Sequence, residues 1–243
     1  MDDIKNYKCI VFGGNGNIGR TVVDYLLKSE KYTKITIFCR KELDRWKNLN
    51  KGEKNQTKMK IIHIESFDFL NNNNFMDIIN EKLDKNIDYN TIFCCLGGRN
   101  ESEYENVDYK LSIKISIIAE KLNIAHFSII SSENSDSNSE NIFLKYRGKM
   151  EEDISKKNIK CISFFRTNYV TKKENPPILY WFLSLFYQCK NNSIECKNLG
   201  KAMVVNDLEV LNFLENGDEE NNRQKIINNF KNEDIKKLSF KKI

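Results

Sequence analysis

The sequence contains little glycine and almost no proline. Its 243 residues include ten glycines and two prolines. Six of the ten glycines lie in two short clusters, at 13–19 and at 97–98, and each cluster follows an apolar run typical of a β-strand. Because glycine is scarce elsewhere, these clusters indicate backbone that must turn sharply or let a ligand approach closely.

Patterns typical of metal sites and disulfides are also missing. The two histidines, His63 and His126, lie beside predicted strands without a motif partner, and we expect ordinary structural roles for them. The seven cysteines form no C-x-x-C pair. Four of them lie in strand-like runs, which is typical of reduced core cysteine in an intracellular protein. Cys94 and Cys95 should point to opposite faces of a sheet. We therefore expect no metal.

No hydrophobic run is long enough to cross a bilayer. The longest, at 178–187, is far shorter than the roughly 20 residues that a span needs. The N-terminus, MDDIKNYK, does not have the regions of a signal peptide. The net charge of +5 resides in residues 223–243, so no nucleic-acid surface is expected over the fold. These features predict a cytoplasmic protein and leave nuclear or peripheral membrane association open.

The first glycine cluster lies in the segment 9–21, CIVFGGNGNIGRT. A strand, a glycine turn and a helix start together form a phosphate site, because the unpaired N–H groups and the positive end of the helix dipole point at the ligand. Gly13, Gly16 and Gly19 fit one dinucleotide-binding pattern, G-x-x-G-x-x-G, whereas Gly14 begins the alternative, G-x-G-x-x-G. The residues expected to contact a dinucleotide here are Gly13, Asn15, Gly16, Asn17, Ile18 and Gly19.

A competing interpretation is the P-loop of nucleotide triphosphatases, because residues 14–21 read G-x-x-x-x-G-R-T. Arg20 stands where that loop needs lysine. The apolar strand predicted at 91–96 ends in Leu-Gly-Gly, without an aspartate to hold Mg²⁺. The dinucleotide pattern is therefore favoured.

The second predicted strand ends in Arg40, about 20 residues after the glycine turn. At this position a dinucleotide site carries an acid for a ribose hydroxyl or a base for a 2′-phosphate. A guanidinium grips two phosphate oxygens, so Arg40 favours NADP over NAD, with NAD as the alternative. Asp68 is placed to bind an adenine amino group, with Phe69 as an apolar wall. A turn cap is the other interpretation of Asp68.

Short apolar runs alternate with amphipathic helical segments along the chain, which is typical of a parallel sheet covered on both faces. The sequence predicts an α/β fold, a doubly wound parallel sheet (Rossmann fold) with a small C-terminal helical extension. The expected domain covers 1–215, and a basic Lys/Asn-rich tail covers 216–243. After the glycine loop, strands are expected at 35–39, 61–64, 91–96, 127–130 and 159–165, and helices at 18–28, 75–83, 103–123, 142–156 and 203–216, with a last amphipathic helix through 226–238.

Three segments carry a family resemblance: FGGNGNIGR, then IFCCLGG followed by NVDYKL, and then HFSIISS. The sequence resembles the atypical branch of the short-chain dehydrogenase/reductase family that includes the Tat-interacting oxidoreductase-like proteins, over roughly residues 8–170. The resemblance implies a Rossmann fold that binds NADPH, with the loops after the fourth and fifth strands facing the nicotinamide. It therefore implies that Gly97, Gly98, Ser131 and Ser132 line the cofactor.

Active members of that family use a tyrosine and a lysine four residues apart on the next helix. The lysine holds the ribose and lowers the pKa of the tyrosine, which gives a proton to the substrate carbonyl. With Gly148 as the anchor, these two positions are Phe143 and Arg147, so the proton donor is missing. Arg147 retains donors for the ribose hydroxyls. Tyr146, or a water positioned by Ser132, is the substitute donor, and the candidate catalytic residues are Ser132, Tyr146 and Arg147.

Two functions follow from this pattern. One is an NADP(H)-binding regulatory or scaffold protein with little or no reductase activity, whose apolar segment 178–188 or basic tail contacts a protein partner. The other is an NADPH-dependent oxidoreductase that acts on an unknown carbonyl substrate with a non-standard proton donor. The missing hydroxyl at Phe143 favours the first, and the glycine loops are compatible with both. Core packing or a lid over the site is the alternative role for 178–188.

Overall fold

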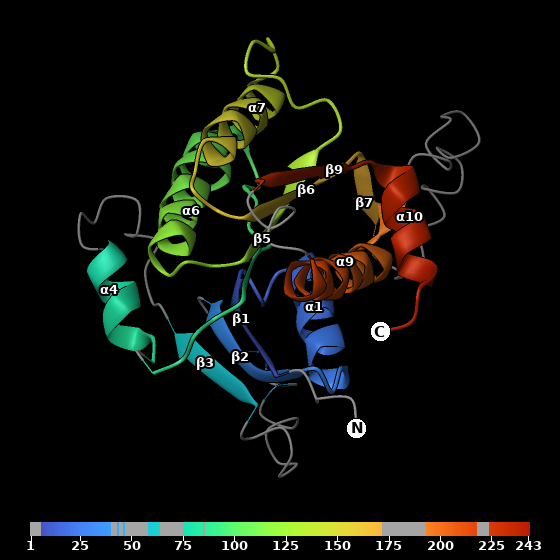
Figure 1. Cartoon of the computed structure of the whole chain (residues 1–243). Coiled ribbons are helices and arrows are strands. Elements are labelled where there is room, and N and C mark those ends of the chain that lie inside the picture. The colour runs from blue at the N-terminus through green and yellow to red at the C-terminus, as the bar shows by residue number, and fades with distance from the viewer. Residues whose placement is uncertain are drawn as a thin grey trace.

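The computed structural model describes residues 6–39, 43, 46, 58–63, 75–84, 86–171, 193–217 and 224–243. At its centre is a seven-stranded sheet in which every neighbouring pair is parallel, in the order β3-β2-β1-β4-β5-β6-β9 (Figure 1). The predicted doubly wound α/β fold is confirmed. The strands are β1 (Tyr7–Phe12), β2 (Tyr32–Cys39), β3 (Met59–His63), β4 (Thr91–Cys94), β5 (His126–Ser132), β6 (Cys161–Thr167) and β9 (Ile226–Phe230), and a separate pair is formed by β7 (Tyr169–Thr171) and β8 (Ser193–Glu195).

Helices cover both faces of the sheet, α1, α9 and α10 on one side and α4, α6 and α7 on the other (Figure 1). Each face has its own hydrophobic core, and the neighbours Cys94 and Cys95 belong to different cores. Because the strands are buried on both faces, they read in the sequence as continuous apolar runs. The helices are α1 (Asn17–Lys28), α4 (Phe75–Lys82), α6 (Ser112–Lys121), α7 (Ile142–Ser155), α9 (Cys196–Asn216) and α10 (Asn232–Phe240).

The helix predicted at 103–123 is built from three pieces. They are α5 (Glu101–Glu103), the π-helix η2 (Tyr104–Leu111) and α6. π-Helical turns are rare and often lie at functional sites. This one carries Asp108, whose side chain is fully buried.

The single helix predicted through 226–238 is wrong in its first part. Residues 226–230 form β9, which pairs in parallel with β6 at the edge of the sheet, and the chain becomes helical only in α10. Ile226 and Phe230 satisfy helical spacing, but they also fit the strand alternation, in which half-buried and exposed residues alternate along β9. The domain boundary expected at 215–216 falls at the end of α9, and the chain then returns to the sheet.

A polar cluster is buried at the amino ends of the strands. Asp207 of α9 accepts hydrogen bonds from the hydroxyls of Tyr32 and of Thr91 (2.7 Å to the latter). Its carboxylate also lies 2.6 Å from Nδ1 of His126, whose Nε2 lies 2.9 Å from Oγ of Ser163. Burial, together with the Asp207 charge, raises the pKa of Tyr32 well above its usual range. This cluster ties α9 to the first residues of β2, β4 and β5 and gives His126 a structural role.

The remaining features of the described residues concern thiols, metals and membranes. Six cysteines there are buried and free, and burial raises the pKa of Cys94 to about 11 and that of Cys161 to about 12, so these thiols are neutral. Within the same residues, no group of three His, Cys, Asp or Glu side chains is arranged to hold a metal ion. Among the helices described, none has the length and apolar character of a membrane span.

Candidate functional site

A pocket of about 400 Å³ lies at the carboxyl ends of β1, β2, β4 and β5. The strand order reverses between β1 and β4, and ligands of open α/β sheets bind in the crevice outside the strands at such a point. The structure therefore places the pocket where a Rossmann fold holds its ligand. Seven of the residues expected to bind cofactor line it: Gly13, Asn15, Gly16, Asn17, Ile18, Gly97 and Arg147.

The glycine loop is shaped by two steric demands. Gly13 has a φ of +78°, and a Cβ there would lie 2.9 Å from the carbonyl oxygen of Cys95. A Cβ on Gly19 would lie 2.1 Å from the carbonyl oxygen of Gly13, so Gly19 lets α1 pack closely against the turn. Gly13 and Gly16 line the pocket, whereas Gly14 does not. This arrangement agrees with the G-x-x-G-x-x-G pattern.

The start of α1 is suited to an anion. The helix begins at Asn17, and its N-cap residue, Gly16, has no side chain with which to cap it. Asn17 and Ile18 line the pocket, so the first turn of the helix, with its unpaired N–H groups and positive dipole end, faces the space where a ligand would lie.

The P-loop interpretation is wrong. In a P-loop, the hydroxyl at the position of Thr21 binds Mg²⁺. Here Oγ1 of Thr21 lies 2.7 Å from the carbonyl oxygen of Ile18 and 2.9 Å from that of Cys196, so its single hydrogen is donated within the contact between α1 and α9. It is thus used for helix packing.

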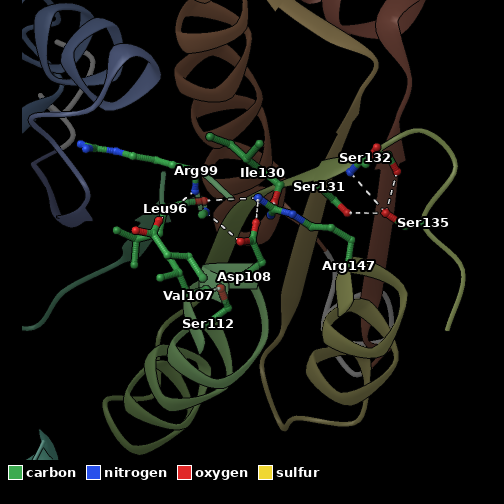
Figure 2. A network of polar contacts seen from close by, with 12 residues as sticks. Leu96, Arg99, Val107, Asp108, Ser112, Ile130, Ser131, Ser132, Ser135 and Arg147 are labelled. Carbon is green, nitrogen blue, oxygen red and sulfur yellow. Dashed lines mark hydrogen bonds and ion pairs between the residues drawn. The ribbon is translucent and has the colours of Figure 1, made fainter. Parts of the chain in front are cut away.

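A buried ion pair lies at the inner end of the pocket. Arg147 of α7 is only 4% exposed, and its Nη2 lies 2.5 Å from Oδ1 of Asp108 (Figure 2). The guanidinium also donates to the carbonyl oxygens of Ile130 and, at 3.5 Å, Leu96. The second carboxylate oxygen of Asp108 accepts the N–H of Gly98 at 2.7 Å. The pair therefore connects α7 and η2 with the chain that follows β4 and with β5.

Sequence reasoning did not include Asp108 among the site residues. The signal was present, because Asp108 precedes Leu111 and Ile115 by three and seven residues, on the apolar face of the predicted helix. A carboxylate on a buried face is costly unless it is paired. Asp108 thus pointed to a buried cationic partner, which the structure identifies as Arg147.

Ser131 and Ser132 end β5 beside the pocket without lining its described part. Oγ of Ser131 donates to Glu151 (2.5 Å). It also lies 3.0 Å from Oγ of Ser135, which accepts the N–H of Ser132 at 3.3 Å (Figure 2). Arg166 of β6 forms an ion pair with the same Glu151. The Ser131 hydroxyl is therefore engaged in a contact between β5, β6 and α7.

Neither Tyr146 nor Phe143 of α7 is among the described residues that line the pocket, and Phe143 lies next to the lining residue Arg147. The Tyr146 hydroxyl donates to Glu105 at 3.0 Å, and this hydrogen bond raises the pKa of Tyr146, so the phenol gives up its proton less readily. The Phe143 ring packs on Tyr104, with ring centroids 5.1 Å apart. The guanidinium carbon of Arg147 lies 5.5 Å from the centre of the Phe143 ring.

Some of the predicted site residues lie outside the described part of the chain. They are Arg40, Asp68 and Phe69, together with the apolar segment 178–188. The remaining glycines have packing positions: Gly19 lies against the turn, and Gly98 lies so close to Asp108 that a Cβ would be 2.6 Å from Oδ2.

The sheet, the glycine turn and the pocket define a Rossmann fold with a glycine-rich turn after its first strand. The chain is similar to Protein HTATIP2 of Rattus norvegicus, with 20% identity over 167 residues. The match covers 67% of this chain and 62% of the length of that relative, so the chain spans less than two thirds of the relative. It confirms the resemblance to the atypical short-chain dehydrogenase/reductase branch with the Tat-interacting proteins. No family model matches the chain.

Solved structures share the fold at low sequence identity. A putative NAD-dependent epimerase/dehydratase from Bacillus halodurans is 14% identical, with a TM-score of 0.58 over 84% of this chain and 89% of its own. UDP-N-acetylglucosamine 4-epimerase from Bacillus cereus is 17% identical, with a TM-score of 0.57 over 95% of this chain and 83% of its own. MoeE5 in complex with UDP-glucose and NAD is 11% identical, with a TM-score of 0.58 over 92% of this chain and 75% of its own. These likenesses confirm the Rossmann fold.

Proposed function

We propose that this chain is an NADP(H)-binding protein of the short-chain dehydrogenase/reductase type, with a regulatory or scaffold role and little or no reductase activity. The observation that supports it most directly is a contrast within one site. The phosphate-binding turn is complete, while the proton-donor position holds Phe143 and the position of the ribose-binding lysine holds Arg147, paired with Asp108.

The pocket fits a nicotinamide dinucleotide. A diphosphate would bind to the first turn of α1 and to the turn at Gly13 and Gly16. Phe38 and Cys39, at the end of β2, line the side of the pocket where the adenosine ribose binds in Rossmann folds. MoeE5, whose structure is similar, is in complex with UDP-glucose and NAD. When bound, such a cofactor supplies hydride transfer. The preference for NADP rests on Arg40.

The residues at the nicotinamide side are suited to holding a ligand more than to moving a proton. Phe143 has no exchangeable proton, and an arginine guanidinium keeps its protons at any ordinary pH. Arg147 is also buried and ion-paired, so its two Nη groups are directed at Asp108 and at main-chain carbonyl oxygens. Contact with a protein partner, through 178–188 or the basic C-terminal residues, belongs to the same proposal.

Titration of the full chain with NADPH and NADH by calorimetry tests the binding function. We expect heat with both and a lower Kd for NADPH. At a ligand concentration 100 times Kd, the stabilisation should be about 2.7 kcal/mol. For a chain of this size that raises the thermal midpoint by roughly 5–10 °C. If neither dinucleotide gives heat or a thermal shift, the proposed function is wrong.

Restoring the family's catalytic pair tests whether the site lacks only its proton donor. We expect the double variant Phe143→Tyr, Arg147→Lys to oxidise NADPH with a panel of aldehydes and quinones, and the wild type not to do so. Lysine retains a positive charge opposite Asp108, and Arg147→Lys alone is the control, because it makes the same change of cation without adding the hydroxyl. The alternative function, an NADPH-dependent oxidoreductase, would instead gain support if the wild type is active and Tyr146→Phe abolishes that activity.

A further inference from the structure

Arg99 is a pocket residue to which the function above assigns no role. It lies between β4 and α5, and its backbone N–H donates to Oε2 of Glu103 at 2.9 Å, which fixes the position of its main chain. Its side chain is exposed and lines the pocket. Figure 2 shows it extended away from the Arg147–Asp108 pair. Within the described part of the chain, its guanidinium makes no hydrogen bond or ion pair.

All charged side chains in the described lining of the pocket are positive. Arg20, Arg99 and Arg147 line the pocket, and no aspartate or glutamate does so among the described residues. The charge of Arg147 is balanced by Asp108. Arg99 therefore adds positive potential to a pocket that already contains the amino end of α1. An anion bound there would meet N–H groups of the helix and, in addition, a guanidinium carried by a different element.

We propose that Arg99 binds the diphosphate of a bound dinucleotide, opposite the amino end of α1. The inference rests on the proposed function and deepens it, because it names the part of the ligand that the site recognises. A guanidinium donates two parallel hydrogen bonds to phosphate oxygens and keeps its charge at every ordinary pH. Recognition then depends on the diphosphate, so ADP-ribose, which lacks the nicotinamide, uses the same contact.

Calorimetry with the full chain tests this contact. The probes are NADPH, ADP-ribose and adenosine 2′-monophosphate, which has a phosphate but no diphosphate. The variant is Arg99→Gln, and the control with the same change of charge is Lys31→Gln. Lys31 is exposed and precedes the first residue of β2, at the opposite end of the strand from the pocket. Unchanged circular dichroism of Arg99→Gln shows that this exposed substitution leaves the fold intact.

In Arg99→Gln we expect about tenfold weaker binding of NADPH and of ADP-ribose, the effect of losing a hydrogen bond to a charged group. We expect no change for adenosine 2′-monophosphate, and none for any ligand in Lys31→Gln. The loss should shrink at high salt, because the contact is exposed and screened.

Two results would overturn the inference and leave the proposed function standing. One is unchanged affinity of Arg99→Gln for NADPH and ADP-ribose. The other is equal weakening of all three ligands, which would reveal a general attraction by the charge and no diphosphate contact. If the wild type binds neither NADPH nor NADH, the proposed function and this inference are both wrong.

Discussion

Replacing Asp108 with alanine is expected to lower the free energy of unfolding by about 3–5 kcal/mol, the usual cost of breaking a buried ion pair on one side. The substitution leaves the guanidinium of Arg147 buried without its counter-charge and the N–H of Gly98 without its acceptor. Urea unfolding followed by circular dichroism measures the loss. Because the segment at Gly97 and Gly98 loses this anchor, the affinity for NADPH should fall as well.

Glu105→Ala is the matched control for Asp108→Ala. Glu105 lies on the same π-helix, η2, and it also pairs with a cation, Lys110 at 2.8 Å, but both side chains are about half exposed. Exposed pairs contribute little to stability because water and salt screen them. We expect Asp108→Asn, which keeps an acceptor for Gly98 but removes the charge, to lie between the two. Equal losses in Asp108→Ala and Glu105→Ala would contradict a structural role for the buried pair.

Asp207→Ala is expected to cost a similar amount, about 3–5 kcal/mol, at the opposite end of the sheet. It leaves the hydroxyls of Tyr32 and Thr91, and Nδ1 of His126, without their acceptor among fully buried groups. Each kcal/mol lowers the thermal midpoint by roughly 2–4 °C in a chain of this size. Differential scanning calorimetry measures the shift.

The control for Asp207→Ala is Glu209→Ala on the same helix, α9, because Glu209 pairs with Lys241 at 2.5 Å in an exposed position. We expect a much smaller shift there. The two buried aspartates should also differ in function: Asp207 lies at the amino ends of the strands, so the folded Asp207→Ala protein should keep its NADPH affinity, whereas Asp108→Ala should not. A thermal shift no larger than that of Glu209→Ala would show that the Asp207 cluster does not stabilise the sheet.

Strands and helices were predictable from the sequence where burial of one or both faces imposes a clear apolar pattern. The runs at 35–39, 91–96 and 127–130 overlap β2, β4 and β5, because a strand covered on both sides is a nearly continuous apolar run in the sequence. The segment at 226–230 was misread because β9 is an edge strand with half-exposed residues. Its few apolar side chains fit both periods, and pairing with β6 decided the outcome.

Some residues of the candidate site were likewise predictable from the sequence, and others were not. The place of residues 13–18 in the pocket was predictable because strand, turn and helix start follow one another directly, so local geometry builds the glycine turn. The positions of the Ser131 and Tyr146 hydroxyls were not predictable from the sequence. Each donates a hydrogen bond to a glutamate from another part of the chain, Ser131 to Glu151 and Tyr146 to Glu105. A hydroxyl in the right stretch of sequence does not tell which acceptor it will meet.

The sequence by itself determined the parallel sheet and the glycine turn at its first strand. Both follow from short-range periodicity and from positions where a positive φ or close packing favours glycine. The tertiary structure alone decided what faces that turn. Packing of η2 against α7 buries Asp108 beside Arg147, and a charge without water must find its counter-charge. That pairing, which no local pattern specifies, engages Arg147, the residue at the position that the family resemblance assigns to the lysine.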